Sequence, residues 1–371
     1  MILLLVLCLA QGDITKIAVG SCYGQFNMKN TEILTSITNW KPDLYIWLGD
    51  AVYADLISYA DKLEISNYQQ WKKAFADFKS TPEYSLLLNT TKITGIWDDH
   101  DYGLNNADSS FFMKHVSQEI YMDFIGEKIN HTGIYREFYI DPRINIIMLD
   151  VRYFRENNNL LGEEQWEWLE KQLKNNKTLN FIITGMQVNV EDRYSLTERW
   201  DNTSRVRLLN LIKDIPGVFI VSGDIHFGEI MINNCLEYPL YELTASGMTH
   251  TEATLYGILA YWYLFNCNAM SYHEYGRILI KHFGTIEIDW DKKTVVLSIQ
   301  DTWGKIIIQK TVLFSDFYKK STKSKLCEQL PLERHLKHIS SCFIIFHLPV
   351  ILHIFSFICF LRKYSHSTYN K

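Results

Sequence analysis

The sequence has no excess of positive charge. Its 371 residues include 37 Lys and Arg against 42 Asp and Glu, which gives a formal net charge of −5 and a pI near 6.2. Such a chain has no bulk attraction for polyanions, which argues against a nucleic-acid-binding protein. The chain also lacks internal repeats and long low-complexity runs. Because 47% of its residues are hydrophobic and 14% aromatic, we expect a folded body with a sizeable core.

Two cysteine and histidine signatures are also missing. There is no CxxC pair and no HExxH sequence, so neither a structural zinc site nor a zincin site is predicted. Three of the seven cysteines lie in apolar end segments, and the other four form no dense disulfide framework. Spacing does not choose between three possible pairings, or one pair with two free thiols. These four are Cys22, Cys235, Cys267 and Cys327.

Apolar segments stand at both ends of the chain. Residues 1–12 predict a secretory signal peptide cut after Gly12, although no basic residue precedes the apolar run; a buried first strand is the alternative. Residues 339–361 are long enough to cross a bilayer and are followed by Arg362 and Lys363, which predicts a transmembrane helix. An amphipathic or buried helix is the alternative there. The polar tail, residues 362–371, disfavours a glycolipid anchor signal.

Four N-x-S/T sequons agree with passage through the secretory pathway. Together with the apolar ends, they predict a single-pass type I membrane protein with a lumenal or extracellular domain and a cytosolic tail. That domain spans residues 13–314, and the Lys- and Ser-rich residues 315–338 link it to the membrane helix. The sequon asparagines are Asn89, Asn130, Asn176 and Asn202.

Short apolar runs alternate with helical patterns along the domain. KIAVG, LYIWLG, KITGIW, INIIML, FIIT and GVFIVSG predict strands, whereas LGEEQWEWLEKQLKNN has the apolar spacing of a helix. A further helical region, about residues 61–89, places Trp71, Phe75 and Phe78 on one core-facing stripe. This alternation predicts an α/β protein. Alternating apolar and polar residues after position 284 predict β-hairpins that complete a sheet.

Polar residues of metal-binding types follow five of these strands directly. Since sites in α/β sheets form at the carboxyl ends of strands, we expect these residues to meet. Each alone has an ordinary explanation, such as a helix cap or a turn, but the joint pattern favours a metal site. They are Cys22 after KIAVG; Asp50 and Tyr53 after LYIWLG; Asp98, Asp99, His100 and Asp101 after KITGIW; Asp150, with Arg152, after INIIML; and Asp224 and His226 after GVFIVSG.

The mixture of side chains indicates the chemistry. Carboxylate-rich sets suit hard cations, and a thiolate or phenolate beside them favours a transition metal such as iron. Two metals that share a bridging carboxylate hold a hydroxide and clamp an in-line displacement at phosphorus. Arg152 would supply a planar fork for the phosphate oxygens. The sequence therefore predicts a two-metal site for a small phosphate ester.

These motifs, in this order, resemble the alkaline phosphatase D (PhoD)-like metallophosphatases of the calcineurin-like phosphoesterase superfamily. The resemblance runs through GSC, PDLYIWLGDAVYAD, GIWDDHDYGLNNAD, LDVRYFR, LGEEQWEWLEKQL, VSGDIHFGEI and YELTASGMTH, which cover nearly all of residues 16–314. It implies a four-layer α-β-β-α sandwich built on two mixed sheets. It also implies a hydrolase that cleaves phosphate mono- or diesters with a metal-activated hydroxide.

The resemblance assigns metal ligands. Asp50 would bridge two metals, ferric iron and a second divalent metal for which Ca²⁺ is expected. Cys22 and Tyr53 would complete the iron site together with Asp224 or His226.

Residues near position 100 receive the other implied roles. Asp99 takes the place of a metal-binding Asn in the wider superfamily, and His100 would assist the leaving group or the developing charge. Asp98 and Asp101 would orient His100 and the backbone. Asn105 would bind calcium or substrate, or else stabilise a turn.

The chain departs from the superfamily pattern at two positions. The usual GHxH sequence is GDIH here, so that Asp224 replaces an imidazole, as in PhoD-like members. A further metal-binding His would fall near TGMQ, where only Met186 and Gln187 are present. For His115 and His250 we expect structural roles.

Two other functions stay open at this point. A membrane-anchored relative could cleave phospholipids. A non-catalytic surface binding protein on the same scaffold is disfavoured, because every mapped ligand position still carries a competent side chain.

Overall fold

The computed structural model describes residues 12–24, 31–53, 55, 68–175, 177–190, 198–251, 271 and 273–319. The predicted transmembrane helix and tail, nearly all of the predicted signal peptide and most of the predicted linker lie outside these ranges, as do Asn176, Cys267 and Cys327. No helix within the described ranges is long and apolar enough to span a bilayer.

The first sheet has six strands in the order β13-β12-β11-β1-β2-β3. Its parallel part consists of β1 (Ile14–Gly20), β2 (Leu44–Leu48) and β3 (Lys92–Ile96). Its antiparallel part consists of β11 (His282–Asp289), β12 (Thr294–Asp301) and β13 (Ile306–Leu313). The hairpins expected after position 284 are therefore present, and β11 joins them to β1.

The second sheet has seven strands in the order β10-β8-β9-β7-β6-β5-β4. Four of them are parallel: β5 (Ile144–Met148), β6 (Leu179–Thr184), β7 (Val218–Ser222) and β9 (Leu240–Ala245). The antiparallel members are β4 (Arg136–Phe138), β8 (Gly228–Asn233) and β10 (Glu274–Ile278). The expected α/β class with two mixed sheets is confirmed.

The two sheets pack face to face, and alternate residues of the second sheet enter different cores. In β5, Ile146 and Met148 belong to the core between the sheets. Ile147 instead packs with residues of α6 (Glu163–Leu173) and α7 (Asn202–Ile212) on the outer side. Because side chains alternate along a strand, a strand buried on both sides needs an unbroken apolar run. This explains the sequences of β5, β6 and β7.

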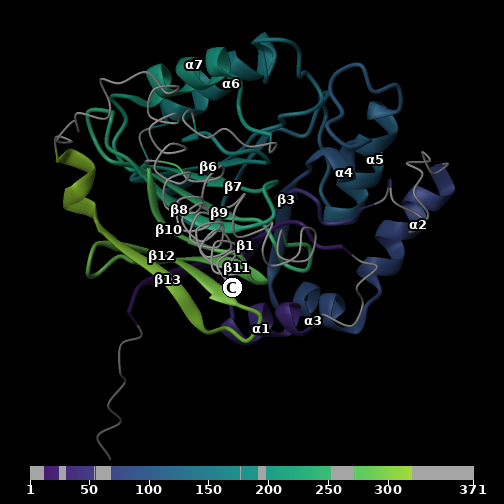
Figure 1. Cartoon of the computed structure of the whole chain (residues 1–371), viewed down its shortest axis with the longest axis horizontal. Coiled ribbons are helices and arrows are strands. Elements are labelled where there is room, and N and C mark those ends of the chain that lie inside the picture. The colour runs from purple at the N-terminus through teal and green to yellow at the C-terminus, as the bar shows by residue number, and fades with distance from the viewer. Residues whose placement is uncertain are drawn as a thin grey trace, which may run out of the picture.

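Helices cover the outer sides of the sheets (Figure 1). Figure 1 shows α6 and α7 on one side of the molecule, and α1 (Glu32–Trp40) and α3 (Pro82–Thr90) on the other. On that second side, the buried Trp47 of β2 donates from its Nε1 to the Tyr84 hydroxyl of α3 at 3.0 Å.

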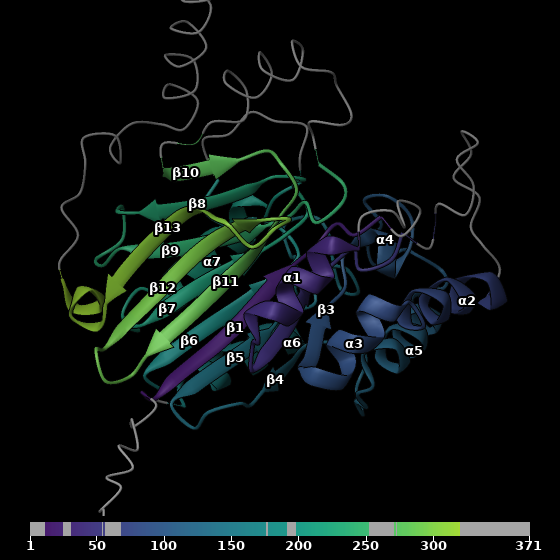
Figure 2. The same ribbon diagram turned by 90° about the horizontal axis from the view of Figure 1, so that it is seen from below.

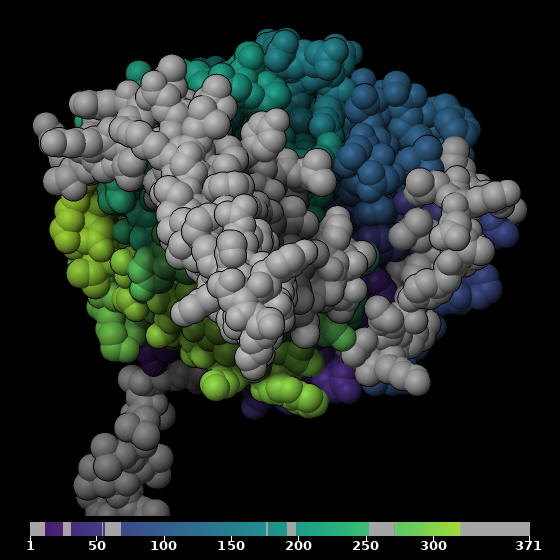
Figure 3. All heavy atoms as spheres, viewed as in Figure 1, coloured from purple at the N-terminus to yellow at the C-terminus, as the bar shows by residue number. Residues whose placement is uncertain are grey.

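The remaining helices gather beyond β3, as Figure 2 shows. They are α2 (Tyr68–Lys79), the short α4 (Asp99–Tyr102) and α5 (Lys114–Ile125). The stripe Trp71, Phe75 and Phe78 on α2 is buried, as expected. In the space-filling view, the blue surface of this helical region and the yellow-green surface of β12 and β13 lie on opposite sides of one face (Figure 3).

The described chain continues past residue 314 into packed structure. Phe314–Tyr318 forms a 3-10 helix, and the Phe317 ring lies 5.7 Å from that of Phe219 in β7. The first residues of the predicted linker therefore pack on the domain.

Candidate metal centre

The carboxyl ends of the parallel strands meet at one edge of the two sheets. There Ser21, after β1, forms a parallel bridge with Ser246, after β9, which connects the two sheets. Ligand-type side chains follow β1, β2, β3, β5 and β7 at this edge. The strand ends that the sequence singled out therefore lie together, as the topology of α/β sheets predicts.

The backbone is strained where four of these side chains begin. Cys22, Asp50, Asp224 and His226 have φ angles of 58°, 50°, 71° and 59°. They account for four of the eight non-glycine residues with positive φ in the described chain. Left-handed backbone is unfavourable for L residues, and it persists at functional sites where the surroundings enforce it. The presence of four such residues at one edge indicates that the surrounding fold holds these side chains in the directions that the site requires.

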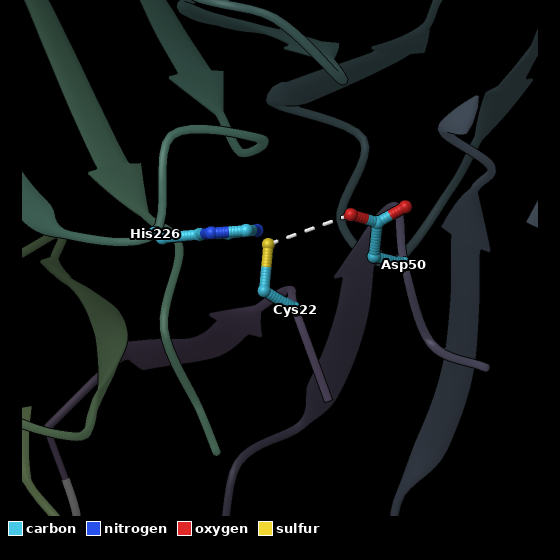
Figure 4. Close-up of side chains that lie close together, drawn as sticks. All are labelled: Cys22, Asp50 and His226. Atoms are coloured by element: carbon cyan, nitrogen blue, oxygen red, sulfur yellow. Dashed lines mark hydrogen bonds between the residues drawn. The ribbon is translucent and has the colours of Figure 1, made fainter. Parts of the chain in front are cut away.

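One half of the centre, called the thiol half, consists of Cys22, Asp50, Tyr53 and His226. The Cys22 Sγ lies between the Asp50 carboxylate and the His226 ring (Figure 4). It is 3.6 Å from Asp50 Oδ2, and the Tyr53 hydroxyl lies 3.4 Å from the same oxygen and 3.3 Å from His226 Nε2. Cys22 is a buried free thiol, whereas Cys235 is disulfide-bonded.

Burial controls protonation in the thiol half. Burial, followed by the charge of Asp50, raises the pKa of Cys22 well above its usual range. Burial, together with neighbouring His250 and His100, lowers the pKa of His226 to about 3. His226 is therefore a neutral imidazole, the form that binds metals.

The other half, called the carboxylate half, consists of Asp98, Asp99 and Asp224, whose oxygens lie within 4.8 Å of one another. Burial raises the pKa of Asp98 to about 6 even against the charge of Arg152. Burial and the charges of Asp98 and Asp99 raise the pKa of Asp224 well above its usual range. The sequence left open whether Asp224 or His226 joins Cys22. In the structure, His226 lies beside Cys22 in the thiol half, whereas Asp224 lies in the carboxylate half.

Asp50, Asp99 and His100 connect the two halves. Their ligand atoms form a third group with the same 4.8 Å limit, and Asp50 and Asp99 each belong to two groups. The His100 backbone N–H also donates to Asp50 Oδ1 at 3.3 Å. Asp50 therefore connects the thiol half to Asp99, and its role as a bridging carboxylate stays a prediction.

His100 has a carboxylate partner that the sequence did not reveal. Its Nδ1 lies 2.8 Å from Oδ2 of Asp55, which is only 2% exposed. Burial opposes protonation, but the charges of Asp99, Asp50 and Asp55 outweigh it and raise the pKa of His100 well above its usual range. Asp55 lies five residues after Asp50 in the same loop, so the strand-end rule alone did not single it out.

Arg152 is completely buried and faces carboxylates. Its Nε lies 2.6 Å from Asp98 Oδ1, and its Nη1 lies 2.6 Å from Glu198 Oε2. The guanidinium fork, which we expected to meet phosphate, therefore holds two acidic side chains. Glu198 also pairs with Arg155 at 2.6 Å and was missed because it follows no strand.

Asp101 and Asn105 differ in their surroundings. The buried Asp101 carboxylate accepts from the backbone N–H groups of Val52, at 2.9 Å, and Ala51, at 3.3 Å. It thereby ties the loop after β2 to the loop after β3, an orienting contact of the expected kind. Asn105 is exposed, and the backbone N–H of its neighbour Asn106 donates to Asp99 Oδ2 at 2.7 Å.

The TGMQ segment contributes space instead of a ligand. A Cβ on Gly185 would lie 2.7 Å from Asp98 Oδ1, so only glycine leaves room for that carboxylate. The Gln187 amide nitrogen donates to Glu229 and Thr244, both at 2.9 Å.

The side chains present fit bound cations. Four buried aspartates, Asp50, Asp98, Asp99 and Asp101, and the half-buried Asp224 share this edge with the buried guanidinium of Arg152. Within the described residues, Asp98 Oδ2 is buried and has no hydrogen-bond partner. Clustered carboxylates and an orphaned oxygen are costly without positive charge, which metal ions would supply.

A match to a family model shows to which protein family the chain belongs. The model of the PhoD-like phosphatases matches residues 17–234, which include every candidate ligand. The chain belongs to the PhoD-like phosphatase family. As a PhoD-like phosphatase it is a metal-dependent hydrolase of phosphoric esters, and the clustered acidic and histidine side chains agree with metal use.

Solved structures show the same fold as this PhoD-like chain. The structure of PhoD matches with a TM-score of 0.64 at 16% identity, over 89% of this chain and 77% of that one. Purple acid phosphatase PPD1 from yellow lupin (Lupinus luteus) seeds matches with 0.57 at 11%, over 85% and 57%. GAP50, the anchor in the inner membrane complex of Plasmodium, matches with 0.51 at 13%, over 89% and 95%. No curated protein gives a significant match.

Proposed function

We propose that the protein hydrolyses phosphate mono- or diesters at a two-metal centre built from the thiol and carboxylate halves. The observation that carries this proposal is the chain of ligand groups that share Asp50 and Asp99. Such sharing suits two neighbouring cations that act on one phosphoryl group.

The donor sets support different metals in the two halves. Cys22, Tyr53 and His226 with Asp50 suit ferric iron, because the anionic thiolate, phenolate and carboxylate balance its threefold charge and imidazole is a common iron ligand. Asp98, Asp99 and Asp224 offer oxygen donors only, which suit a hard divalent cation such as Ca²⁺. The bound metals would supply Lewis acidity and lower the pKa of a water.

His100 would handle the proton of the leaving group. Asp55 accepts at Nδ1, so that this nitrogen carries a proton and Nε2 stays available for the substrate. The surrounding carboxylates keep the imidazole protonated, as a general acid requires. Arg152 would hold Asp98 and Glu198 in place and neutralise part of their charge.

The proposed location is the secretory pathway, as a type I membrane protein anchored by residues 339–361. The three described sequon asparagines, Asn89, Asn130 and Asn202, are all exposed, and Cys235 is disulfide-bonded. Exposed sequons and a disulfide suit an oxidising compartment. Glycosidase sensitivity and protease protection of the full-length protein in microsomes test this topology; an unglycosylated cytosolic protein would refute it.

The activity is tested with the full-length protein and three substrates. We expect phosphate release from an aryl monoester or product release from an aryl diester, and we expect loss of activity after chelation and in His100→Ala. A phospholipid-cleaving enzyme would instead release headgroup from vesicles and spare the soluble esters.

A non-catalytic role is the second candidate, because GAP50 shares the fold and is described as an anchor. It predicts no turnover of any ester with all metals present. The intact ligand groups favour the enzyme.

A further inference from the structure

His250 lies at the metal centre, although its sequence position suggested only a structural role. It follows β9 in the loop that begins with Ser246. The backbone N–H groups of Thr249 and His250 lie 3.3 and 3.2 Å from the carbonyl oxygen of Cys22. The Ser246 hydroxyl contacts Cys22 Sγ at 3.1 Å and accepts from the His226 backbone N–H at 2.8 Å. The loop is therefore fixed to the thiol half.

The His250 ring packs on two side chains of the thiol half. It stacks on Tyr53 with ring centroids 5.4 Å apart and planes at 19°. It also lies 4.4 Å from the His226 ring, at 31°. Two ring contacts and a bonded backbone leave the imidazole little freedom, so its nitrogens are held in a fixed direction at low entropic cost.

The ring nitrogens of His250 are unused. Within the described residues, neither makes a hydrogen bond, and His250 belongs to none of the ligand groups found there. The side chain is half-buried, so solvent or a ligand can reach it. Five other described histidines do use a ring nitrogen: His100, His115, His131, His226 and His282.

A rigid imidazole beside a metal centre, neither ligand nor hydrogen-bonded, suits contact with a bound molecule. Resting on the proposed function, we propose that His250 is a substrate-contacting residue whose ring N–H donates to a phosphoryl oxygen of the ester. A hydrogen bond to such a charged oxygen is stronger than one between neutral groups.

Two variants of the full-length protein separate this role from packing. His250→Phe keeps a flat ring against Tyr53 and His226 but removes both nitrogens, whereas His250→Gln keeps a donor. The matched control is His131→Phe, because His131 packs on Tyr135 at the same 4.4 Å and 31° outside the centre. This control also leaves the sequon at Asn130 intact.

For His250→Phe we expect KM and the inhibition constant of inorganic phosphate to rise about 10- to 100-fold, since one hydrogen bond to a charged group is lost. Metal content should stay normal, and His250→Gln should recover part of the loss. His131→Phe should behave as the unchanged protein. Unchanged KM and phosphate inhibition in His250→Phe would overturn the proposal, as would metal loss in step with activity, which would make the role structural.

Calorimetry of inorganic phosphate binding to the metal-loaded protein separates this inference from the proposed function. If the unchanged protein hydrolyses no ester, the enzymatic function fails, but weaker phosphate binding by His250→Phe would still support the contact. Equal phosphate affinities in a protein that turns over esters would refute His250 alone.

Discussion

The thiol half and the carboxylate half of the centre are both largely buried, but they differ in how their charge is balanced. Cys22 and Tyr53 have pKa values raised above their usual ranges, chiefly by burial, so that without a cation they stay protonated and hydrogen-bonded. In the carboxylate half, Arg152 contacts Asp98 directly and approaches Asp99 at 3.8 Å. Burial raises the pKa of Asp99, but the charges of His100 and Arg152 outweigh this and lower it to about 2.

This difference predicts how the protonation of each half changes when a metal binds. The thiol half must lose protons when a cation binds, because thiolate and phenolate are the ligand forms. The carboxylate half already contains the charged Asp99 and the cation of Arg152, so a metal there adds to an existing ion pair, and only Asp224, whose pKa burial raises well above its usual range, exchanges a proton for the metal. Single-residue variants test whether metal binding in one half depends on the other half.

Asp50→Asn should affect both halves, because Asp50 is a member of the thiol half and also shares a ligand group with Asp99 of the carboxylate half. Loss of its charge removes a ligand from both groups, and we expect turnover to fall by roughly four orders of magnitude, since metal chemistry contributes several kcal/mol. Both metals should be depleted in elemental analysis of the purified protein. Asp77→Asn, an exposed carboxylate on α2, is the control. Retention of one metal at normal content would show that Asp50 does not bridge.

His100→Ala should leave the two halves intact and remove only proton transfer. We expect turnover to fall by roughly two to four orders of magnitude, with metal content near normal. Asp55→Asn should cost less, about 10- to 100-fold, because it acts through His100. The measurements are steady-state kinetics and metal analysis, with His115→Ala as control. Equal losses of metal and activity would make His100 a ligand.

Arg152→Met should break the charge balance of the carboxylate half alone. It leaves the buried Asp98 carboxylate without its partner, which typically costs about 3–5 kcal/mol of unfolding free energy, whereas Glu198 keeps its ion pair with Arg155. The control, Arg207→Met, breaks an exposed pair with Glu163 worth about 0–1 kcal/mol. Urea unfolding of the metal-free proteins measures both. Similar losses would mean that burial does not distinguish the two pairs.

Arg152→Lys refines that comparison. A lysine supplies one point charge, which cannot hold Asp98 and Glu198 at once. We therefore expect an intermediate loss of stability. A rise in KM without any loss of stability would instead support the phosphate contact first predicted for Arg152.

Cys22→Ser should affect the thiol half only. We expect at least a 10- to 100-fold fall in iron affinity, the usual cost of losing even an outer-shell partner, and a fall in activity. Thiolate and phenolate ligands should give the unchanged protein a visible charge-transfer colour, and this variant should lose the thiolate part of it while Tyr53 retains the phenolate part. A colourless, fully active protein would refute iron. Equal loss of the second metal would show that the halves are coupled.

Local sequence determined much of the fold. Strands buried on both sides need unbroken apolar runs, which is why INIIML, FIIT and GVFIVSG could be recognised as β5, β6 and β7. Strands β8, β9 and β10 lack such unbroken apolar runs and were not assigned, although β8 and β9 are neighbours in the chain and pair with each other. The helical stripe of α2 was readable because 3.6-residue periodicity is a local property.

The residues of the candidate centre also fall into two sets: those that the sequence identified and those that only the fold revealed. The rule that sites form at the carboxyl ends of strands needs only a strand and the residues after it, so Cys22, Asp50, Asp99, Asp224 and His226 could be named from the sequence. Applied to β9, the same rule would have led to Ser246. Asp55, Glu198 and His250 lie in loops, and only tertiary structure brings them to the centre. The sequence supplies the type of side chain, but charge balance and proton positions depend on distances between segments remote in the chain. For that reason Arg152 could be recognised as a cation of the site, whereas only the fold could pair it with Asp98 and Glu198.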